Sequence, residues 1–189
     1  MRGSIGRAAS ALIVAACAGL VLIGCAAPRG PLTAGGEQQA PPGVPWAEAS
    51  SGSRACIPAA LDEGSDFWFG NAHTNDGAAD AVIRGVALRG ADNLELVEAV
   101  VTGTEDAIGA VTDPWASGGS WEERVPAAGA IVPAGGTVMV VVRVRPIDAA
   151  ADGTAVGWDV ANESGAVRGV SSSSMGIAVA LDCLGDDGH

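Results

Sequence analysis

Short runs of Val, Ile and Leu recur about every 10 to 15 residues from Arg54 onward. Clusters of Gly, Asp, Asn, Pro and Ser separate these runs, and no segment shows a convincing helical period. Regularly spaced short strands with turn residues between them are typical of antiparallel β-sandwiches. The pattern therefore predicts an all-β fold over residues 54–189, an antiparallel β-sandwich of about seven to eight strands.

The clearest strand runs from Thr137 to Arg145, because its valines alternate with other residues. Alternate residues of a strand point to opposite faces, so the valines are expected to face the core. Residues 133–136, Pro-Ala-Gly-Gly, supply a turn before this strand, and Pro146 ends it because proline has no amide hydrogen. Further strands are expected at Phe67–Thr74, Ala81–Arg89, Leu94–Val101, Trp121–Val125, Ala155–Asn162, Val167–Ser171 and Gly176–Cys183.

Three local features refine this prediction. In the strand Ala81–Arg89, three apolar residues share one face only if an extra residue forms a β-bulge near Gly85. The segments 75–77 and 163–165 look like tight hairpin turns. Trp158 is expected in the core on the same face as Val156 and Val160.

The first 25 residues have the layout of a secretory signal. Arg2 and Arg7 precede an uncharged run of 13 residues, Ala11–Ile23. As a helix this run would cover about 20 Å, which is less than the roughly 30 Å of a bilayer core. A permanent transmembrane helix is therefore the weaker interpretation.

Residues 22–25, Leu-Ile-Gly-Cys, resemble the lipobox of bacterial lipoproteins at all four positions. The resemblance implies that residues 1–24 are a removed signal peptide. It also implies that Cys25 carries acyl chains that anchor the protein to the extracytoplasmic face of the cell membrane. The alternative is an ordinary cleaved signal, for which Ala26 and Ala27 could serve the peptidase.

Residues 25–53 are rich in Pro and Gly and nearly lack β-branched and aromatic residues. Such a composition buries too little apolar surface to offset its ordering entropy, so we expect a disordered, semi-flexible tether. Fully stretched, this tether would reach roughly 95 Å. The expected organisation is thus a signal peptide over 1–24, a lipidated tether over 25–53 and one β-sandwich over 54–189.

Acidic residues dominate the chain beyond Cys25. Only eight Arg, no Lys and all 22 acidic residues follow the leader, which leaves a net charge of −14. Nucleic acid and anionic lipid headgroups are poor partners for such a surface, because like charges repel.

The order of motifs in the body resembles that of bacterial immunoglobulin-like domains of exported proteins. Asn71 and Asn75 close the first strand, the turn at 133–136 precedes the valine strand, and Asp152-Gly153 precedes Val156-Gly157-Trp158. The resemblance covers residues 56–184. It implies a fold and no particular activity, because this architecture has many unrelated roles.

Two cysteines remain in the body, Cys56 near its start and Cys183 near its end. In an oxidising compartment such a pair predicts one disulfide. Cys183 follows Ile177, Val179 and Leu181 at a spacing of two, which places its sulfur on the expected core face. A metal site at these cysteines is disfavoured, because His73 and His189 are the only imidazoles.

Catalytic and metal-binding patterns are not found in the sequence. No nucleophile elbow, paired-histidine motif or phosphate-binding glycine loop is present. His73 is expected as a turn or surface residue, and Asp148–Gly153 lacks the alternating oxygen ligands of a calcium loop. We therefore expect no catalytic residue, no metal and no cofactor.

Trp115 and Trp121 flank a Gly- and Ser-rich stretch at a loop-to-strand junction. Flat aromatic surfaces there could stack on sugar rings or enter a protein partner, and alternatively they could cap one end of the core. The expected function is a non-catalytic, lipid-anchored module that binds another envelope protein. The alternatives are a module that binds cell-wall glycan through these tryptophans and a small metal carrier or enzyme.

Overall fold

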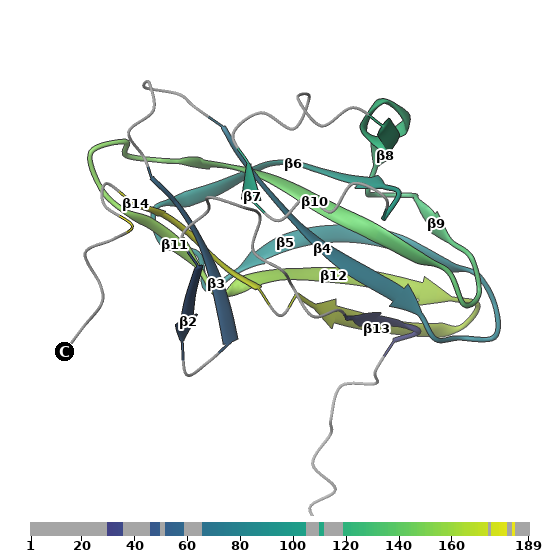
Figure 1. The fold of residues 1–189 in the computed structure, drawn as a ribbon. Helices are drawn as coiled ribbons and strands as arrows, with labels where there is room; N and C mark the ends of the chain where they lie inside the picture. Colours follow the sequence, from purple (N-terminus) through teal and green to yellow (C-terminus); the bar gives the residue numbers. More distant parts are fainter. Residues whose placement is uncertain are drawn as a thin grey trace, which may run out of the picture.

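Strands make up most of the structure, a computed structural model that describes residues 30–35, 46–49, 52–58, 66–104, 110–111, 119–173, 175–180 and 183. They form three sheets arranged in two layers (Figure 1). The first sheet makes one layer, and the second and third sheets together make the other. The prediction of an all-β sandwich is confirmed.

The first sheet contains six strands, in the order β1 (Leu32–Ala34), β4 (Phe67–Asn75), β10 (Thr137–Pro146), β6 (Leu94–Thr102) and β8 (Val125–Pro126), with β7 (Ala110–Val111) also paired to β4. The second sheet has the order β11 (Gly153–Ala155), β14 (Met175–Ala180), β3 (Gly52–Pro58) and β2 (Trp46–Ala49). The third sheet has the order β13 (Val167–Ser172), β12 (Gly157–Ser164), β5 (Ala81–Arg89) and β9 (Ile131–Val132).

The strand order is that of an immunoglobulin-like sandwich. The central strands β4, β10 and β6 follow the B-E-D order of that fold, and β5, β12 and β13 follow its C-F-G order. All paired strands of the described residues are antiparallel except β14 and β3, which run parallel to each other. The expected immunoglobulin-like architecture is therefore present.

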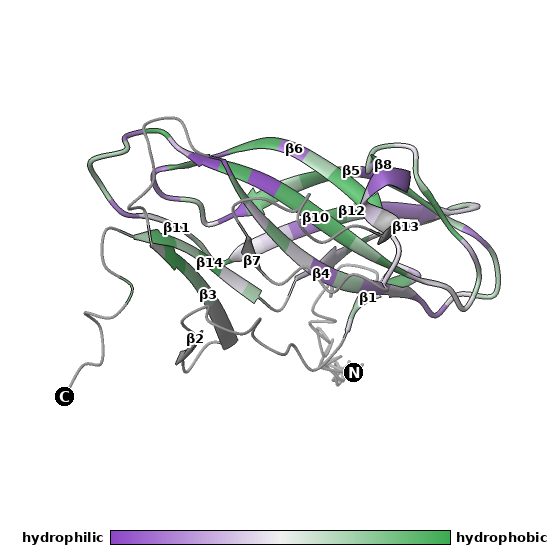
Figure 2. Ribbon diagram, turned by 45° about the horizontal axis from the view of Figure 1, so that its top comes forward, coloured by the Kyte–Doolittle hydropathy of each residue, from purple (hydrophilic) through white to green (hydrophobic). Residues whose placement is uncertain are grey.

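The core lies between the two layers and includes the inward valines of β10. Val140, Val142 and Val144 are fully buried, and Val138 packs against them, as the alternation predicts. Figure 2 shows β10 as mainly hydrophobic toward Thr137 and banded with hydrophilic residues toward Pro146. Other core side chains come from both layers and include Phe67, Phe69, Ile83, Leu94, Trp158, Val160, Met175, Ile177 and Val179.

Two sequence-based details of the third sheet are confirmed. Ile83 pairs with Asn162 and Gly85 pairs with Ala161, so Arg84 is the extra residue of a β-bulge. This bulge brings Ile83, Val86 and Leu88 to the core. The segment 163–165 lies in the hairpin between β12 and β13, where Gly165 has a φ of 58°.

The expected strands Trp121–Val125 and Ala155–Asn162 differ from the structure. Residues Gly119–Glu123 form the 3-10 helix η2, and only Val125–Pro126 pairs as a strand. Val156 lies between β11 and β12, next to Gly157, which has a φ of 143°. Val156 is therefore 58% exposed instead of sharing a core face with Trp158. The segment 75–77 is no hairpin, because β4 and β5 belong to different sheets.

The expected tether contains strands. Leu32–Ala34 pairs with β4, and Trp46–Ala49 pairs with β3. Leu32 is 2% exposed, and the burial of such a side chain stabilises a fold by about 2 kcal/mol. Composition misses this because a three-residue edge strand needs only backbone pairing and one apolar side chain. The prediction of disorder is wrong for these two segments.

A disulfide joins Cys56 to Cys183, as predicted. Its placement differs from the expectation, because Cys56 and Cys183 cluster with Ala178 and Ala180, on the face of the second sheet opposite to the core. β14 ends at Ala180, so the alternation that the sequence suggests does not continue to Cys183.

Candidate functional site

Trp121 does not offer an exposed aromatic surface. Its side chain is 3% exposed and extends from η2 onto the outer face of the first sheet. The Trp121 and Trp68 ring centroids lie 5.0 Å apart, with an angle of 87° between the rings. The Arg124 guanidinium lies 5.1 Å from the Trp121 centroid. The predicted ligand-contact role of Trp121 is therefore wrong, and Trp115 lies outside the described residues.

The outer face of the first sheet is partly covered by Trp121 of η2 and carries ion pairs beside it. A second buried cluster contains Trp68, Val100, Trp121, Met139 and Val141. Beside it, Arg143 lies 3.4 Å from Asp66 and 3.3 Å from Glu98, and Arg145 lies 2.8 Å from Asp66. Trp121 thus covers one face of the sheet and does not cap an end of the core.

His73 is buried, contrary to the expectation of a turn or surface residue. It belongs to the series of alternate β4 residues that begins with Phe67 and Phe69 and faces the core, and its side chain is 0% exposed. Its Nδ1 lies 3.0 Å from the Ser171 Oγ of β13, at hydrogen-bond distance. Desolvation by burial lowers the pKa of His73 from 6.5 to about 4, so the imidazole is neutral at pH 7.

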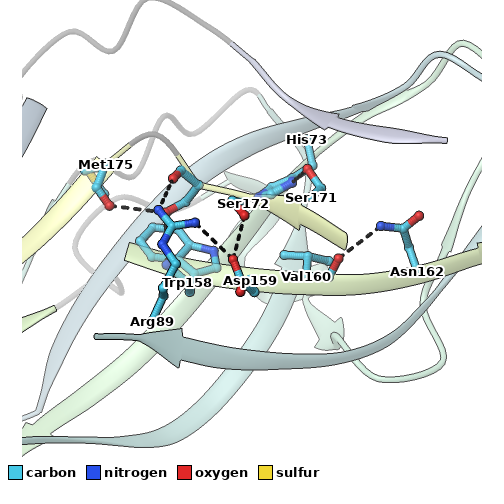
Figure 3. Close-up of polar contacts among 10 residues, drawn as sticks. His73, Arg89, Trp158, Asp159, Val160, Asn162, Ser171, Ser172 and Met175 are labelled. Carbon is cyan, nitrogen blue, oxygen red and sulfur yellow. Dashed lines mark hydrogen bonds and ion pairs between the residues drawn. The ribbon is translucent and has the colours of Figure 1, made fainter. Parts of the chain in front are cut away.

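Other buried polar side chains accompany His73 on β4, β12 and β13, and we call this set the polar cluster. Asn71 and Asn162 are 1% and 2% exposed, and Ser171 is 4% exposed. Figure 3 shows Ser171 beside His73. Within the described part of the chain, neither amide atom of Asn71 nor the Nε2 of His73 has a hydrogen-bond partner. β1 encloses this cluster, because Ala34 pairs with His73 while β1 also contacts β13. A neutral base and a hydroxyl are thus adjacent, but both are covered.

Asn93 organises the loop that contains Asp148–Gly153, the segment that lacks a calcium-loop pattern in the sequence. Its Nδ2 donates to the carbonyl oxygens of Asp148, Ala151 and Asp152 at 2.9, 2.9 and 3.2 Å. The Asp148 amide donates to the Asn93 Oδ1 at 2.8 Å. These carbonyl oxygens therefore converge on an amide of the protein. The described residues contain no group of three or more His, Cys, Asp or Glu side chains that could hold a metal ion.

The outer face of the third sheet differs from that of the first sheet because small side chains form its centre. Gly85 and Ala87 of β5, Ala161 of β12 and Val170 of β13 point away from the core, and we call this surface the open face. Val170 is 52% exposed. Ala161 lies between its register partners Gly85 and Val170, so the centre is flat.

Ion pairs border the open face on two sides. On one side, Arg89 donates to Asp159 at 3.0 Å, and the Ser172 hydroxyl donates to the same carboxylate at 2.6 Å (Figure 3). On the other side, Glu163 accepts a hydrogen bond from Arg84, which lowers the pKa of the Glu163 carboxyl. Arg168 lies 3.5 Å from the same carboxylate. The surface thus has an apolar centre and an ordered polar rim.

Sequence reasoning missed the open face because its residues come from three strands. Gly85, Ala87, Ala161 and Val170 carry no chemical motif, and only the register of the third sheet brings them together. The sequence does contain a signal, because small residues occupy the outward positions of each strand. Alternation alone does not distinguish such positions from those of an ordinary exposed surface.

No family model and no curated protein matches this chain. The ASH / PapD-like domain of human CEP192 (PapD-like domain 7) is similar in structure at 11% identity, with 78% of this chain and 92% of that chain covered and a TM-score of 0.35. The described segments include no helix long and apolar enough to cross a membrane. The immunoglobulin-like fold therefore rests on the strand order and pairing given above.

Proposed function

We propose that this protein is a non-catalytic, lipid-anchored module on the extracytoplasmic face of the cell membrane that binds another exported protein through the open face. The observation that carries the proposal is the apolar centre of this face and its ion-paired rim. Protein interfaces have this composition, with charged residues depleted at the centre and polar groups at the edge. In the described part of the chain, the corresponding face of the first sheet is covered by Trp121, which packs on Trp68, Val100, Met139 and Val141.

Export and anchoring have separate support. The leader and the lipobox-like residues 22–25 are those of a secreted lipoprotein. The Cys56–Cys183 disulfide agrees with export, because disulfides persist in oxidising compartments. The buried positions of His73 and Ser171 favour a structural role for this pair over a catalytic one.

The chemistry of the open face favours a protein partner. Small side chains at the centre allow the partner's bulky side chains to approach the sheet closely. The rim charges already pair with each other. The partner therefore needs hydrogen-bonding groups at the edge of its own surface, and it does not need a net charge opposite to that of the rim. The chain beyond Cys25 has a net charge of −14, which disfavours nucleic acid and anionic lipid.

Anchoring is tested by Cys25→Ser. We expect the variant to lose incorporation of labelled palmitate and to move from the detergent phase to the aqueous phase in a detergent-partitioning experiment, because the thiol that would carry the acyl chains is gone. Cys17→Ser is the matched control and should keep both properties. Palmitate labelling of Cys25→Ser, or its absence from the wild-type protein, would contradict the assignment.

Partner binding is tested by Val170→Arg at the centre of the open face. We expect crosslinking of the full lipidated protein in its native membrane, read by mass spectrometry, to recover a specific exported protein. The variant should reduce this recovery about tenfold or more, because a charge at the centre of an interface is desolvated without a partner.

Ile147→Arg is the control for this experiment, because Ile147 is 71% exposed and lies outside the open face. It should leave recovery unchanged, and both variants should keep the wild-type melting temperature. Equal recovery with both variants would exclude the open face as the binding surface. Recovery of only wall glycan and lipid would reject a protein partner.

A further inference from the structure

The described part of the sandwich includes residue 30 and β1, which the composition assigned to the tether. Leu32 pairs with Asn75 and Ala34 pairs with His73, so β1 forms an edge of the first sheet. The Asp76 amide donates to the Pro31 carbonyl oxygen at 2.9 Å, immediately before the strand. β1 therefore belongs to the folded body.

Gly30 itself is fixed by close packing. A Cβ atom at this position would lie 2.4 Å from the Asn162 Oδ1 and 2.8 Å from the Gly169 Cα. Only glycine allows the backbone to pass so close to β12 and β13. Residue 30 is thus held against the third sheet, while β1 is held against the first.

The turns at one end of the sandwich lie beside the entry of β1, and we call this the entry end. The Asn75 Nδ2 donates to the Val132 and Pro133 carbonyl oxygens at 2.9 and 3.1 Å, which holds the turn at 133–136 there. The Ser164 hydroxyl is 3.5 Å from the Ala79 carbonyl oxygen, which adds the β12–β13 hairpin. The opposite end carries the loop 147–152 between β10 and β11 (Figure 1). Asn93 donates a hydrogen bond to the Asp148 carbonyl oxygen of this loop.

Covalent geometry then limits the distance from the anchor to the entry end. Five residue steps separate Cys25 from Gly30, and a fully extended chain spans ~3.4 Å per residue, so the limit is roughly 17 Å whatever the conformation. A tether that continued to Ser53 would allow roughly 95 Å. The ten residues of β10 place the opposite end about 33 Å beyond the entry end.

We propose that the lipid on Cys25 holds the entry end of the sandwich next to the bilayer surface, with the loop 147–152 directed away from it. This inference rests on the proposed lipidation of Cys25. The entry end faces the lipid surface because the chain between the anchor on Cys25 and β1 is short. Asp76 and Asp80 are exposed at this end, so it lies beside the headgroups without inserting.

Energy transfer to the membrane tests the inference. The purified lipidated protein is placed in phosphatidylcholine vesicles that contain a trace of rhodamine-labelled lipid. A donor dye is attached through a noncanonical amino acid at Ala79 or at Ala150, both exposed and at opposite ends. We expect the transfer rate at Ala79 to exceed that at Ala150 at least twofold.

Two insertions of the same 20-residue Gly/Ser linker give matched variants. Between Ala27 and Pro28, the linker adds an r.m.s. reach of about 25 Å before β1 and should abolish the difference between the two sites. Between Gly36 and Glu37 it follows β1 and should leave the difference intact. Equal transfer at both sites in palmitate-labelled wild-type protein would overturn the proposed orientation and leave the lipidation standing. Absence of palmitate on Cys25 would overturn both the lipidation and the orientation.

Discussion

Replacing both cysteines of the disulfide with alanine is expected to lower the free energy of unfolding by up to about 5 kcal/mol. The bond joins residues 127 positions apart, and closing a loop of this length removes a large conformational entropy from the unfolded chain. In the folded state it joins β3 to the segment after β14, and these two parallel strands are also held together by backbone pairing over six residues of each strand. The effect therefore acts mainly on the unfolded state.

Urea unfolding measures this effect. The Cys56→Ala/Cys183→Ala protein should unfold at a lower urea concentration than the wild-type protein, and reductant should shift the wild-type transition in the same direction. Reductant should leave the double variant unchanged, which provides the control. Because the bond also compacts the unfolded chain, the slope of the transition should rise when it is removed. Identical midpoints for both proteins would contradict a stabilising role.

The second large effect is a loss of stability on acidification that is due to His73. Its pKa is about 4 in the folded protein, against 6.5 as the reference for the unfolded chain. Between these values the unfolded state binds more protons, so stability falls as the pH decreases from 6.5 toward 4 and is constant above this window. A difference of about 2.5 pKa units corresponds to roughly 3 kcal/mol.

Urea unfolding at several pH values between 4 and 7.5 tests the role of His73. The carboxylates also titrate at the acidic end, so the informative quantity is the difference between wild-type protein and His73→Gln. That difference should shrink by about 3 kcal/mol toward pH 4, because glutamine does not take up a proton. His189→Gln, which alters the second histidine, is the control and should retain the wild-type dependence.

Direct titration gives an independent measurement if His73→Gln does not fold. The NMR signal of the His73 ring in the wild-type protein should show a neutral imidazole down to about pH 4. Titration with a midpoint near 6.5 would show that the ring is hydrated, and it would contradict the burial that isolates it beside Ser171.

The parts of the fold that could be predicted from the sequence depend on period-two alternation. The valines of β10 face the core because four consecutive alternate positions carry the same apolar residue. The bulge at Arg84 could be predicted because Ile83, Val86 and Leu88 share a face only with one extra residue. In both cases the apolar pattern within one strand was sufficient.

The remaining elements depend on contacts between distant residues. β1 is a strand because the edge of β4 is available to it, and Trp121 is buried because Trp68 lies opposite. His73 faces the core because the inward face of β4 changes from phenylalanine to polar residues along its length. Among the described residues, the imidazole finds its partner in the hydroxyl of Ser171, 98 positions away in sequence.

The open face could not be predicted for a similar reason. Its centre consists of Gly, Ala and Val, which have no chemical signature, and its rim depends on pairing across three strands. The sequence predicts a ligand contact for the tryptophans because aromatic residues often contact ligands. A large aromatic side chain can equally well cover the face of a sheet. The structure assigns the second role to Trp121.

The bond between Cys56 and Cys183 also has a mechanical consequence. When tension is applied between the N-terminal segment and the C-terminal end, the load passes from Cys56 directly through the sulfurs to Cys183. The strands between these positions lie in a loop that the disulfide closes covalently, so the force does not extend this part of the chain. β5, β6, β10 and β12 are therefore shielded from stretching. Among the described elements, the strands before Cys56 still carry the force. The pairing of β1 with β4 can therefore be pulled apart.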